Sequence, residues 1–390
     1  MKDNSVTLSP KLVLLMAITC GISVANIYYN QPLLGDLARY FNVSTKSIGL
    51  VSTFTQVGYG LGMLAIVPLG DIKERKSLII KMLAFSVFSL ILLGTSMNFY
   101  WLLLASFLVG FSSIITQLIV PFAAELASPN QRGSIIGKVL SGLLIGILLA
   151  RTVSGFIGSI FGWRSIFFIG AFLIVSLSYA LIKLLPSSLP KSNESYIQTM
   201  LSLVDLFKSN SVIKASSITG AMMFGAFNVF WTTLIFFLES PTYGLGAKEA
   251  GIFGLLGVAG VFAAPLIGKL SDKKTPRFVV GLSILMSLIS YIIFYIFGKN
   301  IIGLIVGVIF IDLGTQSGQV SNQTRIHNIS SEARSRYNTI FMFTYFLGGS
   351  IGSFLGTYSW NIWKWKGVCI SGLILMVIAT ITHFTIGRKE

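Results

Sequence analysis

The segment Gly70-Asp71-Ile72-Lys73-Glu74-Arg75-Lys76 joins two long apolar runs, and a related segment, Gly268-Lys269-Leu270-Ser271-Asp272-Lys273-Lys274-Thr275-Pro276-Arg277, occurs about half a chain later. In each segment an acidic residue is followed within a few positions by basic residues. Short charged turns between apolar runs are typical of the cytoplasmic loops of membrane proteins, where Lys and Arg gather. The two segments together indicate a helical membrane protein with two related halves.

Twelve apolar stretches, each about long enough to cross a bilayer as a helix, fill most of the 390 residues. With 54% hydrophobic and 11% charged residues, the composition differs from that of a soluble domain, in which about 25% of residues are charged. The stretches are also too long and too continuously apolar for barrel strands, which are about 10 residues long and alternate. The sequence therefore predicts an all-α integral membrane protein with twelve transmembrane helices. The predicted spans are 12–34, 47–70, 78–97, 100–124, 134–160, 165–185, 211–238, 249–270, 278–298, 301–324, 338–361 and 365–386.

The distribution of basic residues orients these spans. If both termini lie on one side, that side carries 21 of the 29 Lys and Arg residues and the other side 7, with Arg151 inside a span. Since loops rich in Lys and Arg stay in the cytoplasm, both termini are predicted to be cytoplasmic. The charges lie in short gaps between apolar runs, so the net charge of +16 does not indicate nucleic acid as a partner.

The only long connection between spans, residues 186–210, divides the chain into halves of six. Residues 1–185 are predicted to form an N-terminal six-helix bundle and residues 211–390 a C-terminal one. Apolar residues recur at helical spacing in the connection, which is typical of a helix in the cytoplasmic membrane interface, and a partner-binding helix is the alternative. These residues are Ile197, Met200, Leu201, Val204 and Phe207.

The two halves repeat at an offset of 202 residues. Anchors at one nearly constant offset across successive spans indicate two parallel repeats, because an even number of spans brings both copies in from the same side. The offset aligns Asn26–Asn30 with Asn228–Thr232, Gly49 with Gly251, Gln117 with Gln319, Arg132 with Arg334 and Trp163-Arg164 with Trp365-Lys366.

This organisation resembles the major facilitator superfamily of secondary transporters. The signature of that family after the second span is Gly-x-x-x-Asp-Arg-x-Gly-Arg-Arg, of which this chain keeps the Asp and the final basic pair and departs from the rest with Val67, Ile72 and Glu74. The resemblance implies a gating motif whose carboxylates cap helix ends and hold the cytoplasmic side shut. The motif residues are Asp71, Arg75, Lys76, Gly268, Asp272 and Arg277.

The fifth predicted span resembles the pattern of the superfamily's antiporters, Gly-x8-Gly-x3-Gly-Pro-x2-Gly-Gly. Small residues occupy all five glycine positions, and Arg151 replaces the proline. We expect Gly137, Gly146 and Gly155 to serve close helix packing. The resemblance implies the bacterial branch of twelve-span sugar, drug and metabolite exporters, and a multi-pass protein of the cytoplasmic, or inner, membrane.

Two opposite charges are predicted near the middle of the bilayer. Asp312 lies about eleven residues into the tenth span and begins a polar helix face with Gln316 and Gln319, while Arg151 has a similar depth in the fifth span. A charge at this depth is costly unless it is paired or faces water, so we predict that Asp312 and Arg151 couple transport to protons, with Glu239 as a further candidate. A polar seam that only packs helices and a purely structural ion pair are the alternatives.

The resemblance also implies a central substrate cavity, because the first, fourth, seventh and tenth helices line it in this superfamily. An aromatic belt at the membrane interface is the alternative for the aromatic members. The predicted cavity residues are Asn26, Tyr28, Tyr29, Asn30, Gln56, Gln117, Asn228, Trp231, Gln316 and Gln319.

The leading functional hypothesis is a secondary active transporter that moves a small organic compound, a drug or a metabolite, by alternating access with proton-coupled export. A proton-coupled uptake symporter or a uniporter of a sugar or metabolite is the alternative, and a non-transporting membrane receptor is a more remote one. No ATP-binding loop, carboxylate pair or nucleophile set points to an enzyme, and neither a cofactor nor a metal is expected. The expected partners are the substrate, protons and the lipid bilayer, and we expect a monomer.

Overall fold

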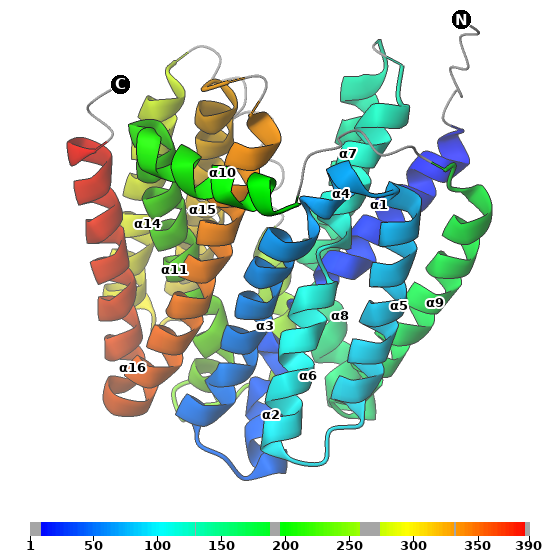
Figure 1. The fold of residues 1–390 in the computed structure, drawn as a ribbon. Helices are drawn as coiled ribbons and strands as arrows, with labels where there is room; N and C mark the ends of the chain where they lie inside the picture. Colours follow the sequence, from blue (N-terminus) through cyan, green and yellow to red (C-terminus); the bar gives the residue numbers. More distant parts are fainter. Residues whose placement is uncertain (1–8, 129, 188–195, 258–273, 331–332, 387–390) are drawn as a thin grey trace, which may run out of the picture.

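The computed structural model describes residues 9–128, 130–187, 196–257, 274–330 and 333–386, and these residues form an all-helical bundle (Figure 1). Within these ranges, nine helical segments are long and apolar enough to cross a membrane. The elements are α1 (Pro10–Ala25), η1 (Gln31–Leu33), α2 (Leu34–Phe41), α3 (Thr45–Ile66), α4 (Leu69–Ile72), α5 (Arg75–Gly94), α6 (Phe99–Ser112), α7 (Ile115–Leu126), α8 (Arg132–Phe161), α9 (Ser165–Leu184), α10 (Tyr196–Ser209), α11 (Ser211–Leu238), α12 (Ala247–Phe253), η2 (Gly254–Gly257), α14 (Pro276–Phe297), α15 (Ile301–His327) and α16 (Arg334–Thr385).

Many of the long helices begin at a residue whose side chain accepts a hydrogen bond from the first turn. Ser, Thr and Asn suit this position because they satisfy backbone N–H groups that have no partner within the helix. The capping residues are Ser9, Ser44, Asn98, Asn210, Thr275 and Asn300. These polar residues stand just before the predicted apolar spans, so they set where the helices start.

The sequence predicts one regular helix over 12–34, but the structure divides this region into α1, an irregular stretch and the start of α2. After α1, several amides between Ile27 and Leu33 bond to the carbonyl three residues back, which makes a tighter and irregular stretch before α2. Pro32 lacks an N–H and cannot continue a regular α-helix. The side chain of Asn30 holds the irregular stretch against α3, since its Nδ2 donates to Thr55 Oγ1 at 3.1 Å and its Oδ1 accepts from Ser52 Oγ at 3.1 Å.

α1 begins and α16 ends at the same end of the bundle, where α10 also lies (Figure 1). α16 reverses direction at Lys364, whose φ of 52° and ψ of −143° interrupt the helix, so it contains both predicted spans 338–361 and 365–386. This arrangement agrees with termini on one side of the membrane. The count of twelve spans and the cytoplasmic location of this end stay predictions. We call the opposite end, where α2 lies, the outer end.

Helices from the two predicted halves pack against each other near the outer end. α3 packs against α16, and α8 against α12. A β-carbon at Gly49 of α3 would collide with the side chain of Thr357, and one at Gly251 of α12 would lie 2.8 Å from the carbonyl oxygen of Arg151. The two glycines aligned by the repeat therefore permit equivalent helix crossings. The division into six-helix bundles at 1–185 and 211–390 stays a prediction.

The connecting helix α10 has a mixed face. Ile197, Leu201 and Val204 are exposed, whereas Met200 and Phe207 pack against the bundle. Tyr196 Oη donates to the carbonyl of Ala65 in α3 at 3.0 Å, and Arg336 of α16 donates to Ser202 Oγ at 3.3 Å. α10 thus touches helices of both predicted halves while it keeps an exposed apolar stripe, as an interfacial helix requires.

Candidate functional site

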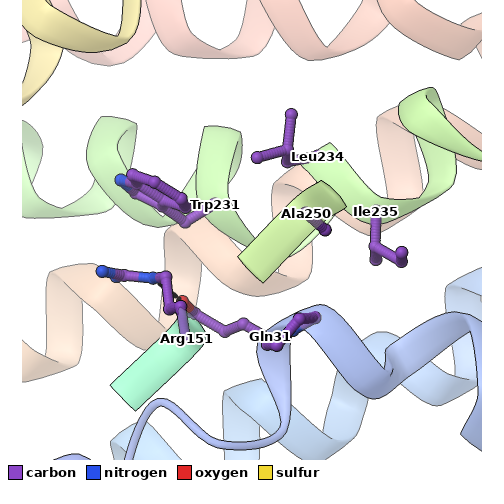
Figure 2. Close-up of a pocket in the computed structure, with 7 residues that line it drawn as sticks. Gln31, Arg151, Trp231, Leu234, Ile235 and Ala250 are labelled. Carbon is purple, nitrogen blue, oxygen red and sulfur yellow. Dashed lines mark hydrogen bonds between the residues drawn. The ribbon is translucent and has the colours of Figure 1, made fainter. Parts of the chain in front are cut away.

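Arg151 of α8 is buried among residues of the irregular stretch before α2 and of α11. Its side chain is buried, and its Nε donates to Gln31 Oε1 at 2.7 Å. The guanidinium carbon lies 4.0 Å from the ring centroid of Trp231, 4.7 Å from that of Tyr28 and 5.5 Å from that of Phe227. Figure 2 shows Gln31, Arg151 and Trp231 converging on this point. Cation–π contacts of this kind stabilise a buried guanidinium.

Asp312 of α15 faces the same region as Arg151. Both residues line one narrow cavity, together with Phe227, Gly257 and Gln316. Asp312 is 3% exposed, and its Oδ2 has no hydrogen-bond partner among the described residues. No ion pair or hydrogen bond joins Asp312 to Arg151 within the described structure. The structure therefore brings the two predicted midplane charges to one cavity without pairing them.

Glu239 lies elsewhere, which corrects its expected grouping with Asp312 and Arg151. It caps the end of α11 at the outer end, where its Oε1 and Oε2 each accept from Arg39 of α2 at 2.9 Å. Asp36 accepts from the same arginine at 2.6 Å. The bond to Glu239 raises the pKa of Arg39 above its usual range, so Arg39 remains charged. We call Asp36, Arg39 and Glu239 the outer latch.

Three of the predicted cavity residues, Asn26, Tyr29 and Asn30, do not line the cavity beside Arg151 and Asp312, although the resemblance implied that they would. Asn30 bonds to α3, as described above. Asn26 and Tyr29 lie beside Gly170 of α9, where a β-carbon would be 3.5 Å from Asn26 Oδ1 and 3.4 Å from the Tyr29 ring. The irregular stretch packs these three side chains against α3 and α9, whereas Tyr28 and Gln31 of the same stretch turn toward Arg151.

Among the predicted amides, Gln56 and Asn228 form a bond between the two predicted halves. Gln56 Nε2 of α3 donates to Asn228 Oδ1 of α11 at 3.3 Å, and Asn228 Nδ2 donates to the carbonyl of Phe224 at 2.9 Å. Both amide side chains are buried. They connect helices across the interface and do not line the cavity beside Asp312.

The repeat-related glutamines each bond a tyrosine that the sequence did not single out. Gln117 Nε2 donates to Tyr59 Oη at 3.2 Å, and Tyr345 Oη donates to Gln319 Oε1 at 3.3 Å. The Tyr59 ring also lies 4.1 Å from the ring of Phe346, so α3 and α16 meet through aromatic side chains here. Two glutamines at one offset thus make the same kind of contact in each half.

The gating motif is described only in part. Arg75 forms an ion pair with Glu125 at 3.3 Å and donates to the carbonyl of Gly70 at 2.8 Å, so it joins the start of α5 to the end of α7. Arg277 donates to the carbonyl of His383 at 3.5 Å, and Lys76 is half-buried in the first turn of α5. Gly268, Asp272 and the side chain of Asp71 lie outside the described residues.

Two of the three glycines of α8 that were expected to serve close packing lie against another helix, and the third does not. Gly146 lies against Gly21 of α1, and Gly155 lies against α12, where a β-carbon would meet the carbonyl of Ala247. A β-carbon at Gly137 would meet nothing within 4 Å, so the expectation of close packing is wrong there. The first half of α8 is largely exposed, which removes the steric need for glycine at this position.

Several residues that complete these sites were not predicted from the sequence. Gln31 holds Arg151, Phe227 covers it, and Arg39 pairs with Glu239. Pro32 was an available signal for an irregular stretch that turns Gln31 toward Arg151, whereas nothing in a linear pattern pairs residues 200 positions apart. No group of three metal-ligating side chains occurs in the described part of the chain.

Comparisons with known proteins agree with this architecture. The family model described as Major Facilitator Superfamily matches residues 15–352 and 252–389. An uncharacterized transporter, YgaY, from Escherichia coli O157:H7 is 36% identical over 371 residues, which cover 95% of this chain and 94% of that protein. A probable sugar efflux transporter from Helicobacter pylori strain J99 is 26% identical, over 83% of this chain and 82% of the relative.

Solved structures show the same fold at low identity. The structure of a bacterial homolog to the human lysosomal transporter Spinster, in an inward-facing and occupied conformation, matches with a TM-score of 0.74 and 16% identity over 97% of both chains. The peptide transporter POT in complex with sulfate matches with a TM-score of 0.77 and 12% identity, over 97% of this chain and 95% of that one.

Proposed function

Because the chain belongs to the major facilitator superfamily, a family of multi-pass membrane transporters, we propose that it is a proton-coupled secondary transporter that moves a small organic compound by alternating access. One observation carries the proposal. Arg151 and Asp312, from the two predicted halves, line one buried cavity without being paired. Two buried charges of opposite sign have a paired state and a separated state, and a proton on the carboxylate shifts the balance between them.

The arrangement of the two ends supports alternating access. At the outer end, the latch from Arg39 to Glu239 and the crossing of α8 with α12 hold the two predicted halves together. At the other end, the first half of α8 is largely exposed, and a cavity of about 500 Å³ lies beside it and α1, lined by Ser134, Lys138 and Ser141 among others. These features support an inward-facing state.

Protonation of Asp312 is the coupling step in this proposal. While Asp312 is charged, it attracts Arg151 across the cavity, and this attraction is strong because little water screens it. A proton on Asp312 removes the attraction and leaves Arg151 to a substrate. An isolated charge at this depth costs several kcal/mol, so Arg151 needs either the charged Asp312 or a substrate as its partner. Movement of the two predicted halves and occupation of the cavity therefore become linked.

Export is the direction we propose first. The small residues of α8 that resemble the antiporter pattern support it, and so does the relative named as a probable sugar efflux transporter. Uptake by proton symport is the second candidate. It is favoured by the cavity itself, since a proton on Asp312 and a substrate on Arg151 can be bound at the same time.

Flux in proteoliposomes tests the coupling. We expect a compound panel to contain a substrate whose flux responds to an imposed pH gradient, and the direction of proton movement distinguishes antiport from symport. Asp312→Asn should retain exchange without a gradient but lose the response to pH, because the neutral side chain cannot release a proton. Asp205→Asn, on the exposed side of α10, is the matched control and should keep the response. Wild-type coupling in Asp312→Asn would rule out Asp312 as the proton site.

A further inference from the structure

Three hydrogen-bond donors around Arg151 have no partner. Arg151 Nη2, Trp231 Nε1 and Gln31 Nε2 are all buried, and none of them bonds to another described residue. Each unpaired buried donor costs about 1–3 kcal/mol, so such groups are rare in a protein interior and need an explanation. Three of them lie on side chains that touch one another. In the neighbouring cavity, the buried acceptor Asp312 Oδ2 also lacks a partner among the described residues.

The geometry of Arg151 restricts how a ligand can approach it. Trp231 and Tyr28 lie close to the guanidinium, at 4.0 Å and 4.7 Å, in cation–π contact. Its Nε is already bonded to Gln31, so the free donors lie on the Nη edge. A guanidinium edge matches the two oxygens of a planar carboxylate, which can accept two parallel hydrogen bonds.

The surroundings define the rest of the ligand. The cavity shared with Asp312 is lined by Leu144, Ile147, Leu148 and Phe227, which suit an apolar body. Arg151 is the one cation among the described lining residues of this cavity and of the pocket that contains Trp231. A single positive charge balances one negative charge at low dielectric, so a monoanion fits better than a dianion.

We propose that Arg151, Trp231 and Gln31 bind the carboxylate of a small organic monoanion with an apolar body. This proposal rests on the proposed function in one respect, since it takes the anion to be the transported compound. The carboxylate accepts from Arg151 Nη2 and from Trp231 Nε1, and the body extends toward Asp312. The negative charge of Asp312 competes with the ligand for Arg151, so neutralising Asp312 tightens binding.

Binding to the purified full-length chain in detergent tests the proposal without any transport step. We would titrate three matched acid and amide pairs by calorimetry at one pH: acetate and acetamide, butanoate and butanamide, and benzoate and benzamide. At least one carboxylate should bind about tenfold or more tightly than its amide, as expected for hydrogen bonds to a charged group. Equal binding of acid and amide in all three pairs, including no binding by either, overturns the proposal.

Variants assign the effect to the named side chains. Arg151→Gln should abolish the preference for the acid, and Trp231→Phe, which keeps an aromatic ring but removes the donor, should reduce it by about tenfold. Asp312→Asn should tighten carboxylate binding by about threefold or more through loss of the competing charge. Lys248→Gln, an exposed cation over Phe156, is the control and should bind as wild type. An unchanged preference in Trp231→Phe, which keeps the packing, would contradict the site even if Arg151→Gln fails to fold.

The two proposals fail in different ways. If carboxylate binding depends on Arg151 but flux does not respond to any pH gradient, the proposal of proton coupling is refuted and the proposed anion site is supported. If flux of a neutral compound responds to pH and the protein shows no preference for carboxylates, the proposed anion site is refuted and the proposal of a proton-coupled transporter is supported.

Discussion

Arg39 joins the two predicted halves through side-chain atoms at the outer end, because it bonds both oxygens of Glu239 and also Asp36. The Arg39 side chain is 61% exposed and that of Glu239 21%, so water and salt weaken the pair. Exposed ion pairs contribute about 0–1 kcal/mol. Such a contact is strong enough to bias two states of similar energy and weak enough to open in each transport cycle.

Weakening the outer latch should favour the outward-open state. Glu239→Gln should raise the population open at the outer end by up to about fivefold, which corresponds to about 1 kcal/mol. Thr357→Cys, at the crossing of α3 and α16, reports this opening through reaction with an impermeant thiol reagent. The native Cys20 and Cys369 are buried, which limits their background reaction. Identical labelling with and without Glu239→Gln would show that the latch does not hold the outer end.

Repeated elements use the same contacts in both halves. Arg132 Nε donates to the carbonyl of Ala124 at 2.9 Å, near the end of α7, and Arg334 Nε donates to the carbonyl of His327 at 3.0 Å, at the end of α15. A cation there satisfies carbonyl groups that lack partners in the last turn and complements the helix dipole. The sequence offset of 202 that aligned these arginines therefore corresponds to equivalent positions in space.

The crossing of α3 with α16 should tolerate no side chain at Gly49. Gly49→Ala places a methyl group against Thr357, so we expect it to hold the outer end open and slow transport. Increased reaction of Leu234→Cys with an impermeant thiol reagent would report the opening. Combining Gly49→Ala with Thr357→Gly should restore closure, because the second change removes the Thr357 β-carbon, Oγ1 and Cγ2, the three atoms that would collide.

Gly137→Ala is the matched control for this crossing, since its methyl group would meet nothing within 4 Å. It should leave both labelling and flux close to wild type. Normal transport by Gly49→Ala alone would show that transport does not require close contact between α3 and α16 at Gly49.

At the scale of the whole molecule, the two predicted halves are joined at the outer end by the outer latch and by two helix crossings, and Arg151 is buried between them. The helices that carry its neighbours come from distant parts of the chain, with Gln31 in η1 and Trp231 in α11 (Figure 2). α10 touches α3 and α16 at the other end and so connects the two predicted halves. In the alternating-access cycle proposed above, rocking of one predicted half against the other would change the cavity beside Arg151 and the position of α10 together.

The basic loops predict the orientation of the molecule in the membrane, and this prediction can be tested directly. Tags at both termini and one inserted near Asn193 should all report from the cytoplasm, because 21 of the 29 basic residues lie on that side in the predicted topology. Protease protection of each tag in right-side-out vesicles measures this. A terminus that is digested from outside would overturn both the orientation and the assignment of two parallel repeats.

The sequence by itself determined the helical membrane fold, the repeat and the two charges at the centre. These properties follow from the length of apolar runs, from a constant offset and from the cost of a charge in lipid, all of which are readable along one chain. Only the tertiary structure decided which side chains meet. It turned Asn26, Asn30 and Tyr29 away from the cavity that Arg151 lines, paired Glu239 with Arg39, and surrounded Arg151 with Gln31 and aromatic rings. The physical reason is that such contacts depend on the rotation of each helix and on the irregular stretch before Pro32, and periodicity in the sequence specifies neither.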